Sequence, residues 1–72
     1  MRELKNQLKH ERNKLDKQID ELVEQLNQQH DKQTVSDTQM SLMETQFMLM
    51  ETYYVLLNRR IKDLKHKRGA KR

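Results

Sequence analysis

Histidine and serine side chains are the first candidates for chemistry in this chain, because it contains no cysteine. The three histidines, His10, His30 and His66, stand twenty or more residues apart, whereas a helical metal site needs two ligands about one turn apart. The two serines, Ser36 and Ser41, have no histidine at helical contact spacing to act as a base. There is no glycine-rich phosphate loop. We therefore expect no catalytic site, no metal site and no cofactor, and predict that the chain is not an enzyme.

The other chemically distinctive feature is a basic C-terminal segment. Residues 59–72 hold eight bases against one acid, a net charge of +7, whereas residues 1–58 hold seven bases against ten acids, which is −3. This asymmetry has three interpretations: a helix end stabilised by cations, a nuclear-import signal, or a surface that binds nucleic-acid phosphates. The last two favour an intracellular, nuclear location. The basic residues are Arg59, Arg60, Lys62, Lys65, Lys67, Arg68, Lys71 and Arg72.

The element that must carry these residues is a helix with one apolar stripe. Apolar side chains recur at spacings of three and four, which places them on the a and d positions of a heptad repeat. The pattern predicts an all-α fold, in which a long helix forms a homo-oligomeric coiled coil. The predicted dimer core is Leu8, Leu15, Ile19, Leu22, Leu26, Met40, Met43, Phe47, Met50, Tyr54, Leu57, Ile61 and Leu64.

The composition of the chain also indicates that its apolar stripe packs against a partner. With 72 residues, one glycine, no proline and 36% charged residues, the chain has little means of enclosing a core of its own. A stripe of this kind needs a partner, most simply a second copy. The absence of cysteine suits a reducing compartment. The most apolar window, residues 40–57, contains Glu44 and Glu51 and is not a membrane span.

A polar zone interrupts the stripe at residues 27–38. Gln29, Gln33 and Ser36 occupy consecutive core layers, and Arg12 occupies another, so we interpret them as polar layers that set the register. The alternative is a break, because Ser36 to Gln39 fits a capping box that would start a new helix at residue 37. Two observations favour a continuous helix: residues 31–38 contain no Gly, Pro or Asn, and the stripe resumes in phase.

A second apolar stripe appears beside the first between residues 40 and 57. Leucines recur every seven residues at heptad position c, and further apolar residues lie at b and g. We interpret this surface either as a docking site for a helical partner or as additional core of a larger homomeric bundle. Its residues are Leu42, Met48, Leu49, Tyr53, Val55 and Leu56.

Strand direction is the remaining structural question. Parallel pairing stacks each polar layer on its own copy and is favoured for that reason. Antiparallel pairing sets Phe47 near Leu22 and Tyr54 near Leu15 of the other helix, with Arg12 beside Leu57. A helical hairpin or four-helix bundle is the other alternative.

These observations predict an oligomerisation or scaffold segment of a larger protein. We expect a coiled-coil helix over residues 1–67, divided into a two-stranded seam (1–26), the polar zone (27–38) and a two-seam segment (39–67), followed by a disordered basic tail (68–72). It would join copies of itself and recruit a helical protein through residues 40–57. The alternative function is a nucleic-acid-binding or nuclear-targeting module, dimerised by the coil and acting through residues 59–72, with nucleic acid or an import receptor as partner.

Overall fold

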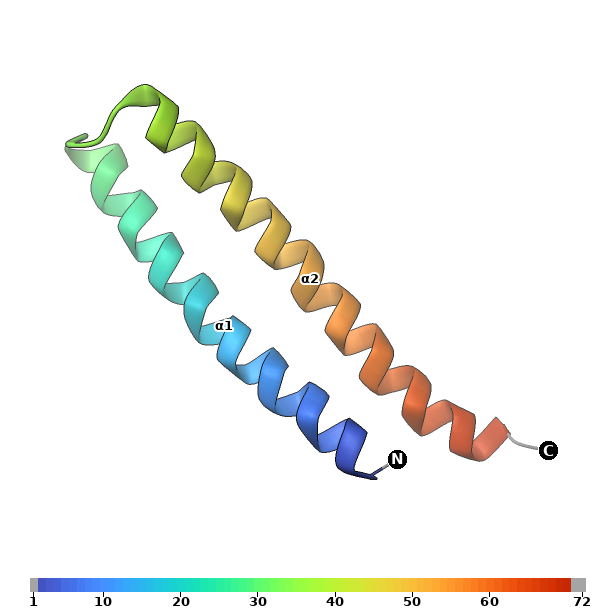
Figure 1. The fold of residues 1–72 in the computed structure, drawn as a ribbon. Coiled ribbons are helices and arrows are strands. Elements are labelled where there is room, and N and C mark those ends of the chain that lie inside the picture. The colour runs from blue at the N-terminus through green and yellow to red at the C-terminus, as the bar shows by residue number, and fades with distance from the viewer. Residues whose placement is uncertain (1, 71–72) are drawn as a thin grey trace.

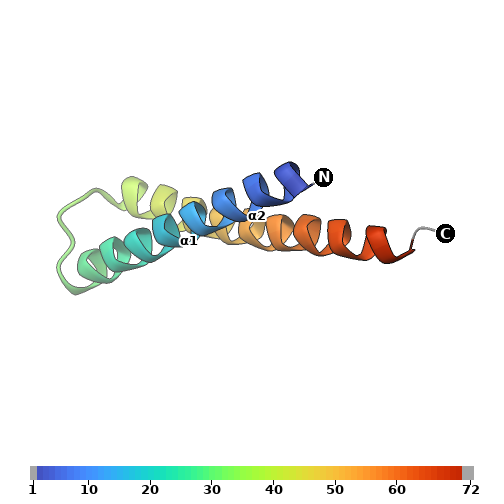
Figure 2. The same ribbon diagram turned by 90° about the horizontal axis from the view of Figure 1, so that it is seen from below.

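The chain forms a helical hairpin in a computed structural model (Figure 1). The structure describes the backbone of residues 2–70 and the side chains of residues 2–64. Helix α1 spans Arg2–Asp31 and helix α2 spans Asp37–Ala70. The two helices run antiparallel, with both termini at one end and the turn at the other (Figures 1 and 2). The molecule is a rod of 56 × 16 × 14 Å.

The predicted single continuous helix is wrong, because the polar zone is a turn. Ser36 ends the turn as the N-cap of α2: its Oγ accepts a hydrogen bond from the Gln39 backbone N–H at 3.1 Å. The helix therefore begins at Asp37, as the capping-box alternative predicts. Residues 32–36 connect the two helices, and the helical hairpin is the architecture that the chain adopts.

Glutamine side chains, rather than glycine or proline, close this turn. The Gln29 Oε1 accepts hydrogen bonds from the backbone N–H groups of Thr34 at 2.8 Å and Val35 at 3.2 Å. The Gln33 Nε2 donates to the Val35 carbonyl and to the Asp37 carboxylate, both at 2.8 Å. No residue in the described backbone has a positive φ angle, so the turn has no position that requires glycine. The lack of glycine is therefore compatible with a break in the helix.

Resumption of the apolar stripe in phase does not require a continuous helix either. Each helix of a hairpin needs only its own stripe, and these two stripes face one another across the molecule. Among the described residues, the buried side chains are all apolar, and Leu57 is the only one with 0% exposure. The buried residues are Leu8, Leu15, Ile19, Leu22 and Leu26 of α1 with Leu57 and Ile61 of α2.

The backbone of α2 continues to Ala70, beyond the helix end that the sequence predicted at residue 67. Residues 71–72 of the predicted disordered tail lie outside the described residues.

Candidate protein-interaction surface on α2

Helix α2 has two apolar sides, and α1 covers only one of them. On the covered side, Phe47, Met50, Tyr54 and Leu64 are partly buried and pack against the cluster formed by the buried leucines and isoleucines. Met40 and Met43, nearer the turn, are also partly buried. The residues predicted as a dimer core thus lie between the two helices of a single chain.

The opposite side of α2 is exposed. The residues predicted as a second seam are all more than a third exposed, from 38% for Tyr53 to 65% for Leu49. Leu42, Leu49 and Leu56 follow one another at seven-residue intervals along this side, and Met48 and Val55 flank them. We call this surface, from Thr38 to Leu56 at heptad positions b, c, f and g, the outer face of α2.

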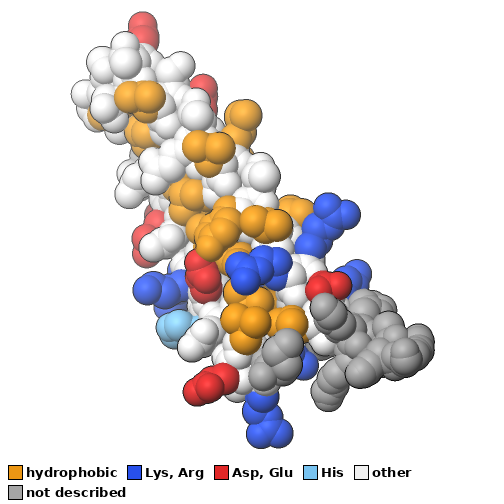
Figure 3. All heavy atoms as spheres, turned by 45° about the vertical axis from the view of Figure 1, so that its right-hand side comes forward, with side chains coloured by type: hydrophobic (Ala, Val, Ile, Leu, Met, Phe, Trp, Pro, Cys, Tyr) orange, Lys and Arg blue, Asp and Glu red, His pale blue; other side chains and the backbone are white. Residues whose placement is uncertain are grey.

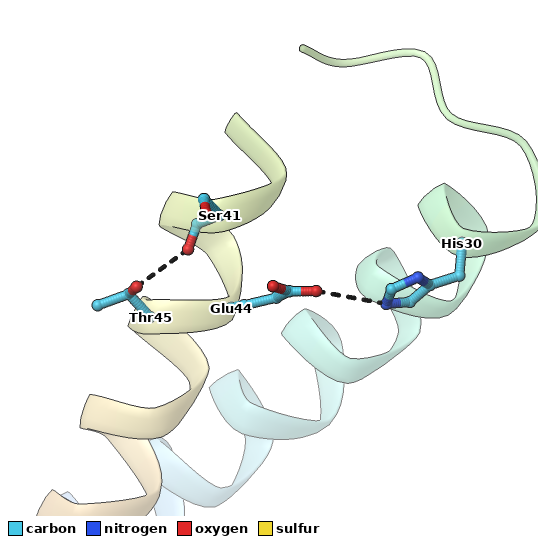
Figure 4. Close-up of polar contacts among 4 residues, drawn as sticks. All are labelled: His30, Ser41, Glu44 and Thr45. Carbon is cyan, nitrogen blue, oxygen red and sulfur yellow. Dashed lines mark hydrogen bonds and ion pairs between the residues drawn. The ribbon is translucent and has the colours of Figure 1, made fainter. Parts of the chain in front are cut away.

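The outer face carries no charge over its length. Between residues 38 and 58 the chain has only two side chains that are charged at neutral pH, Glu44 and Glu51. Both lie on the flank toward α1: the Glu44 carboxylate is 3.8 Å from His30 Nε2 of α1 (Figure 4), and Glu51 lines a hollow together with Val23 of α1. The view from the α2 side shows hydrophobic side chains in a row along the rod, whereas cationic side chains gather toward the end that holds the termini (Figure 3).

Two threonines on the outer face have hydroxyl groups that are already hydrogen-bonded. The Thr45 Oγ1 donates to the Ser41 carbonyl at 3.0 Å (Figure 4), and the Thr52 Oγ1 donates to the Met48 carbonyl at 2.9 Å. Each bond runs to the residue four positions earlier in the same helix. These hydroxyls need no further partner when covered, so both threonines can be buried against another apolar surface at little cost. The threonines were not among the predicted surface residues, although the seven-residue spacing of Thr38, Thr45 and Thr52 was a signal for them.

The surface is also hollowed. A shallow, open depression of about 390 Å³ is lined by Leu42, Thr45, Gln46, Leu49, Met50 and Tyr53. It lies along the side of α2 that holds the exposed leucines, and a side chain of another helix can insert into it.

A polar contact between the helices borders this face. The Tyr53 hydroxyl donates a hydrogen bond to the Glu11 carboxylate of α1. This hydrogen bond is the main reason that the pKa of Tyr53 is raised, with smaller contributions from desolvation and from the negative charge of Glu11. The contact anchors an outer-face residue to α1 and fixes the rim of the surface.

The residues predicted as polar register layers have other positions. Gln29, Gln33 and Ser36 form the turn, as described above. Arg12 is partly buried between the helices, and its Nη1 donates to the Asn58 Oδ1 at 3.1 Å. These four polar residues thus help to hold one chain as a hairpin.

The predicted basic patch is described only in part. Arg59, Arg60 and Lys62 are exposed near the termini, beside Asp63. The side chains of the remaining members lie outside the described residues: Lys65, Lys67, Arg68, Lys71 and Arg72.

The described part of the chain contains no group of three His, Cys, Asp or Glu residues that could hold a metal ion. His10 and His30 are exposed, and the side chain of His66 is not described. Neither helix has, within the described residues, an apolar window long enough to cross a membrane.

Comparison with known proteins identifies one family. The Sequestin family model matches residues 2–63, which include all of α1, α2 as far as Asp63 and the whole outer face. The chain therefore belongs to the Sequestin family. No curated protein and no solved structure matches it significantly.

Proposed function

We propose that this member of the Sequestin family is a protein-interaction hairpin without catalytic activity. In this proposal α1 and the turn hold α2 in place, and the outer face of α2 docks a helix of another protein chain. Docking joins the two chains by burying apolar surface, in the manner of an amphipathic helix laid against a groove. The hairpin thus performs the scaffold role that the heptad pattern predicts.

The observation that carries the proposal is the uncharged outer face with Leu42, Leu49 and Leu56 exposed along it. Isolated apolar side chains are common on protein surfaces, but a contiguous uncharged row is typical of a docking site. Complete burial of one leucine side chain contributes about 1.5–3 kcal/mol. Since these three are about half exposed, covering them would contribute roughly half of that amount each.

The small size of the hairpin supports the same proposal. Two helices bury only one side of each helix, and chains of this length rarely obtain more than about 3–5 kcal/mol from a single core. A third helix against the outer face would enclose α2 on both apolar sides. Binding would therefore stabilise the hairpin as well as join the chains.

Site-specific photo-crosslinking in cells that naturally make the protein tests this proposal. A benzophenone side chain replaces Leu49 on the outer face in one variant and Lys17 on the exposed side of α1 in a matched control. We expect covalent protein adducts at position 49 and none above background at position 17, with the adduct mapped to a helical segment by peptide mass. Equal yields at the two positions would refute the proposal.

A second candidate function is binding of nucleic acid through the basic end, favoured by the exposure of Arg59, Arg60 and Lys62. Such binding would release counterions, so its affinity would fall steeply with salt and depend little on base sequence. Fluorescence anisotropy with labelled duplex DNA tests it, using Arg59→Gln/Arg60→Gln/Lys62→Gln against His10→Gln as control. Measurable affinity at low salt that the triple variant loses supports this function, and no affinity at low salt removes it.

A further inference from the structure

We infer that the chain docked on the outer face is a second copy of the hairpin, with α2 antiparallel to α2 of its partner. This inference rests on the proposed docking function and specifies its partner. It is carried by three properties of the outer face: the order of its side chains, the hydrogen bonding of its threonines, and the distribution of charge along α2.

The outer face has its own heptad seam of alternating large and small residues. Heptad positions f and c, which are neighbours on the helix surface, carry threonine and leucine in strict alternation at spacings of four and three. This seam lies on the side of α2 away from α1, so a second helix can reach it without displacing α1. Its members are Thr38, Leu42, Thr45, Leu49, Thr52 and Leu56.

Antiparallel pairing makes this seam complementary to itself. With a two-fold axis near residue 47, Leu42 lies opposite Thr52 of the second copy, and Leu49 lies opposite Thr45. The end layers pair Thr38 with Leu56. Every layer therefore combines one large and one small side chain, which gives layers of equal volume and lets the two helices interdigitate. Parallel pairing in register would instead oppose leucine to leucine and threonine to threonine in alternate layers.

Two of the three threonine hydroxyls of the seam would stay hydrogen-bonded in this interface. Thr45 and Thr52 already donate to backbone carbonyls of their own helix, at 3.0 and 2.9 Å. Only their methyl groups need to face the leucines of the second copy, so burial leaves these two hydroxyl donors paired.

The charges at the two ends of α2 favour the same direction. Arg59, Arg60 and Lys62 outnumber Asp63 near the termini, whereas the turn end holds Asp37 as the first residue of α2. Parallel pairing would place each cationic group beside its own copy. Antiparallel pairing places the cations of the two copies at opposite ends of the helix pair and opposes the two helix dipoles favourably.

This geometry predicts which positions meet across the two-fold axis. At heptad position b, Met48 lies beside Met48 of the second copy, because it is close to the axis. Ser41 and Val55 lie seven residues before and seven residues after Met48, so Ser41 of one copy meets Val55 of the other. All three positions are exposed in the hairpin, and the native chain has no cysteine.

Disulfide trapping with single-cysteine variants of the full chain tests the inference. The variants are Met48→Cys, Ser41→Cys and Val55→Cys, each checked for native helicity by circular dichroism and oxidised at equilibrium. We expect Met48→Cys to cross-link to itself, the other two to remain monomeric alone, and an equal mixture of those two to give the mixed disulfide.

Each other outcome overturns the inference. Self-cross-linking of Ser41→Cys and Val55→Cys without the mixed product means that the copies pair in parallel. No cross-link at any position, with a monomeric mass in sedimentation, means that the second copy does not dock there. In that case the photo-crosslinking of position 49 still decides the proposed function, since an adduct with a different protein would leave docking intact and exclude only self-association.

Discussion

The adjacent leucines at positions 56 and 57 offer the sharpest test of the hairpin. They have the same side chain and stand in the same turn of α2, yet Leu57 is 0% exposed between the helices and Leu56 is 49% exposed on the outer face. Replacement of either by alanine changes helix propensity by the same small amount. Any difference between the two variants therefore reports burial by α1.

The expected losses in the free energy of unfolding differ about threefold between the two variants. Leu57→Ala removes a fully buried side chain and leaves a cavity in a two-helix core, which costs about 3 kcal/mol. Leu56→Ala removes a side chain that is already half exposed, which costs about 1 kcal/mol in the monomer. Since a core of this size supplies only about 3–5 kcal/mol, we expect Leu57→Ala to leave about 0–2 kcal/mol and to unfold a measurable part of the population at room temperature.

Urea unfolding followed by circular dichroism measures both values. The experiment is run at the lowest workable protein concentration, because self-association through the outer face would add stability to the parent and not to Leu56→Ala. Equal destabilisation by the two substitutions, or a larger effect of Leu56→Ala in the dilute limit, would refute the packing of α2 against α1 described above.

Three further predictions concern the turn and the helix contacts. Ser36→Ala removes the N-cap of α2 and should lower the free energy of unfolding by about 1 kcal/mol, and an unchanged urea midpoint would contradict the cap. Replacing residues 32–36 by alanines should turn the connection into helix, so that α1 and α2 become one helix and each α2 packs against α1 of a second copy. The particle should then lengthen in X-ray scattering from the 56 Å of the hairpin to about 100 Å, and an unchanged length would contradict this. The pKa of Tyr53 is raised by Glu11, so its hydrogen bond contributes stability below pH of about 10 that is lost as pH rises through the raised pKa. In a Tyr54→Phe background, Glu11→Gln should therefore shift the tyrosinate absorbance of Tyr53 to lower pH, and no shift would contradict the contact.

Periodicity could predict which side of each helix is apolar. The stripe of α1 was readable because its leucines alternate with charged and amide side chains, and all five of its predicted core residues from Leu8 to Leu26 are buried. The second stripe of α2 was equally readable, since Leu42, Leu49 and Leu56 repeat every seven residues and are exposed. What periodicity cannot specify is the chain that covers a stripe, because a helix packs in the same way against its own chain and against another.

The turn was only partly predictable from the sequence. Its start signal at Ser36 was visible and marked the first residue of α2 correctly. The closing interactions were not, since Gln29 and Gln33 look like ordinary surface residues of a helix until the chain folds back around them. The same limit applies to the contact of Tyr53 with Glu11, which joins residues 42 positions apart and leaves no local pattern.

We propose that the inner side of α2 holds the hairpin together while the outer face joins it to another chain. Sedimentation equilibrium combined with circular dichroism tests this most directly on Leu42→Gln/Leu49→Gln/Leu56→Gln, with His10→Gln/Lys17→Gln/Glu24→Gln on the exposed side of α1 as the matched control. We expect the parent and the control to sediment as dimers, whereas the leucine variant sediments as a monomer that keeps its helicity. Loss of helicity in the leucine variant, or a dimer that survives the three substitutions, would contradict it.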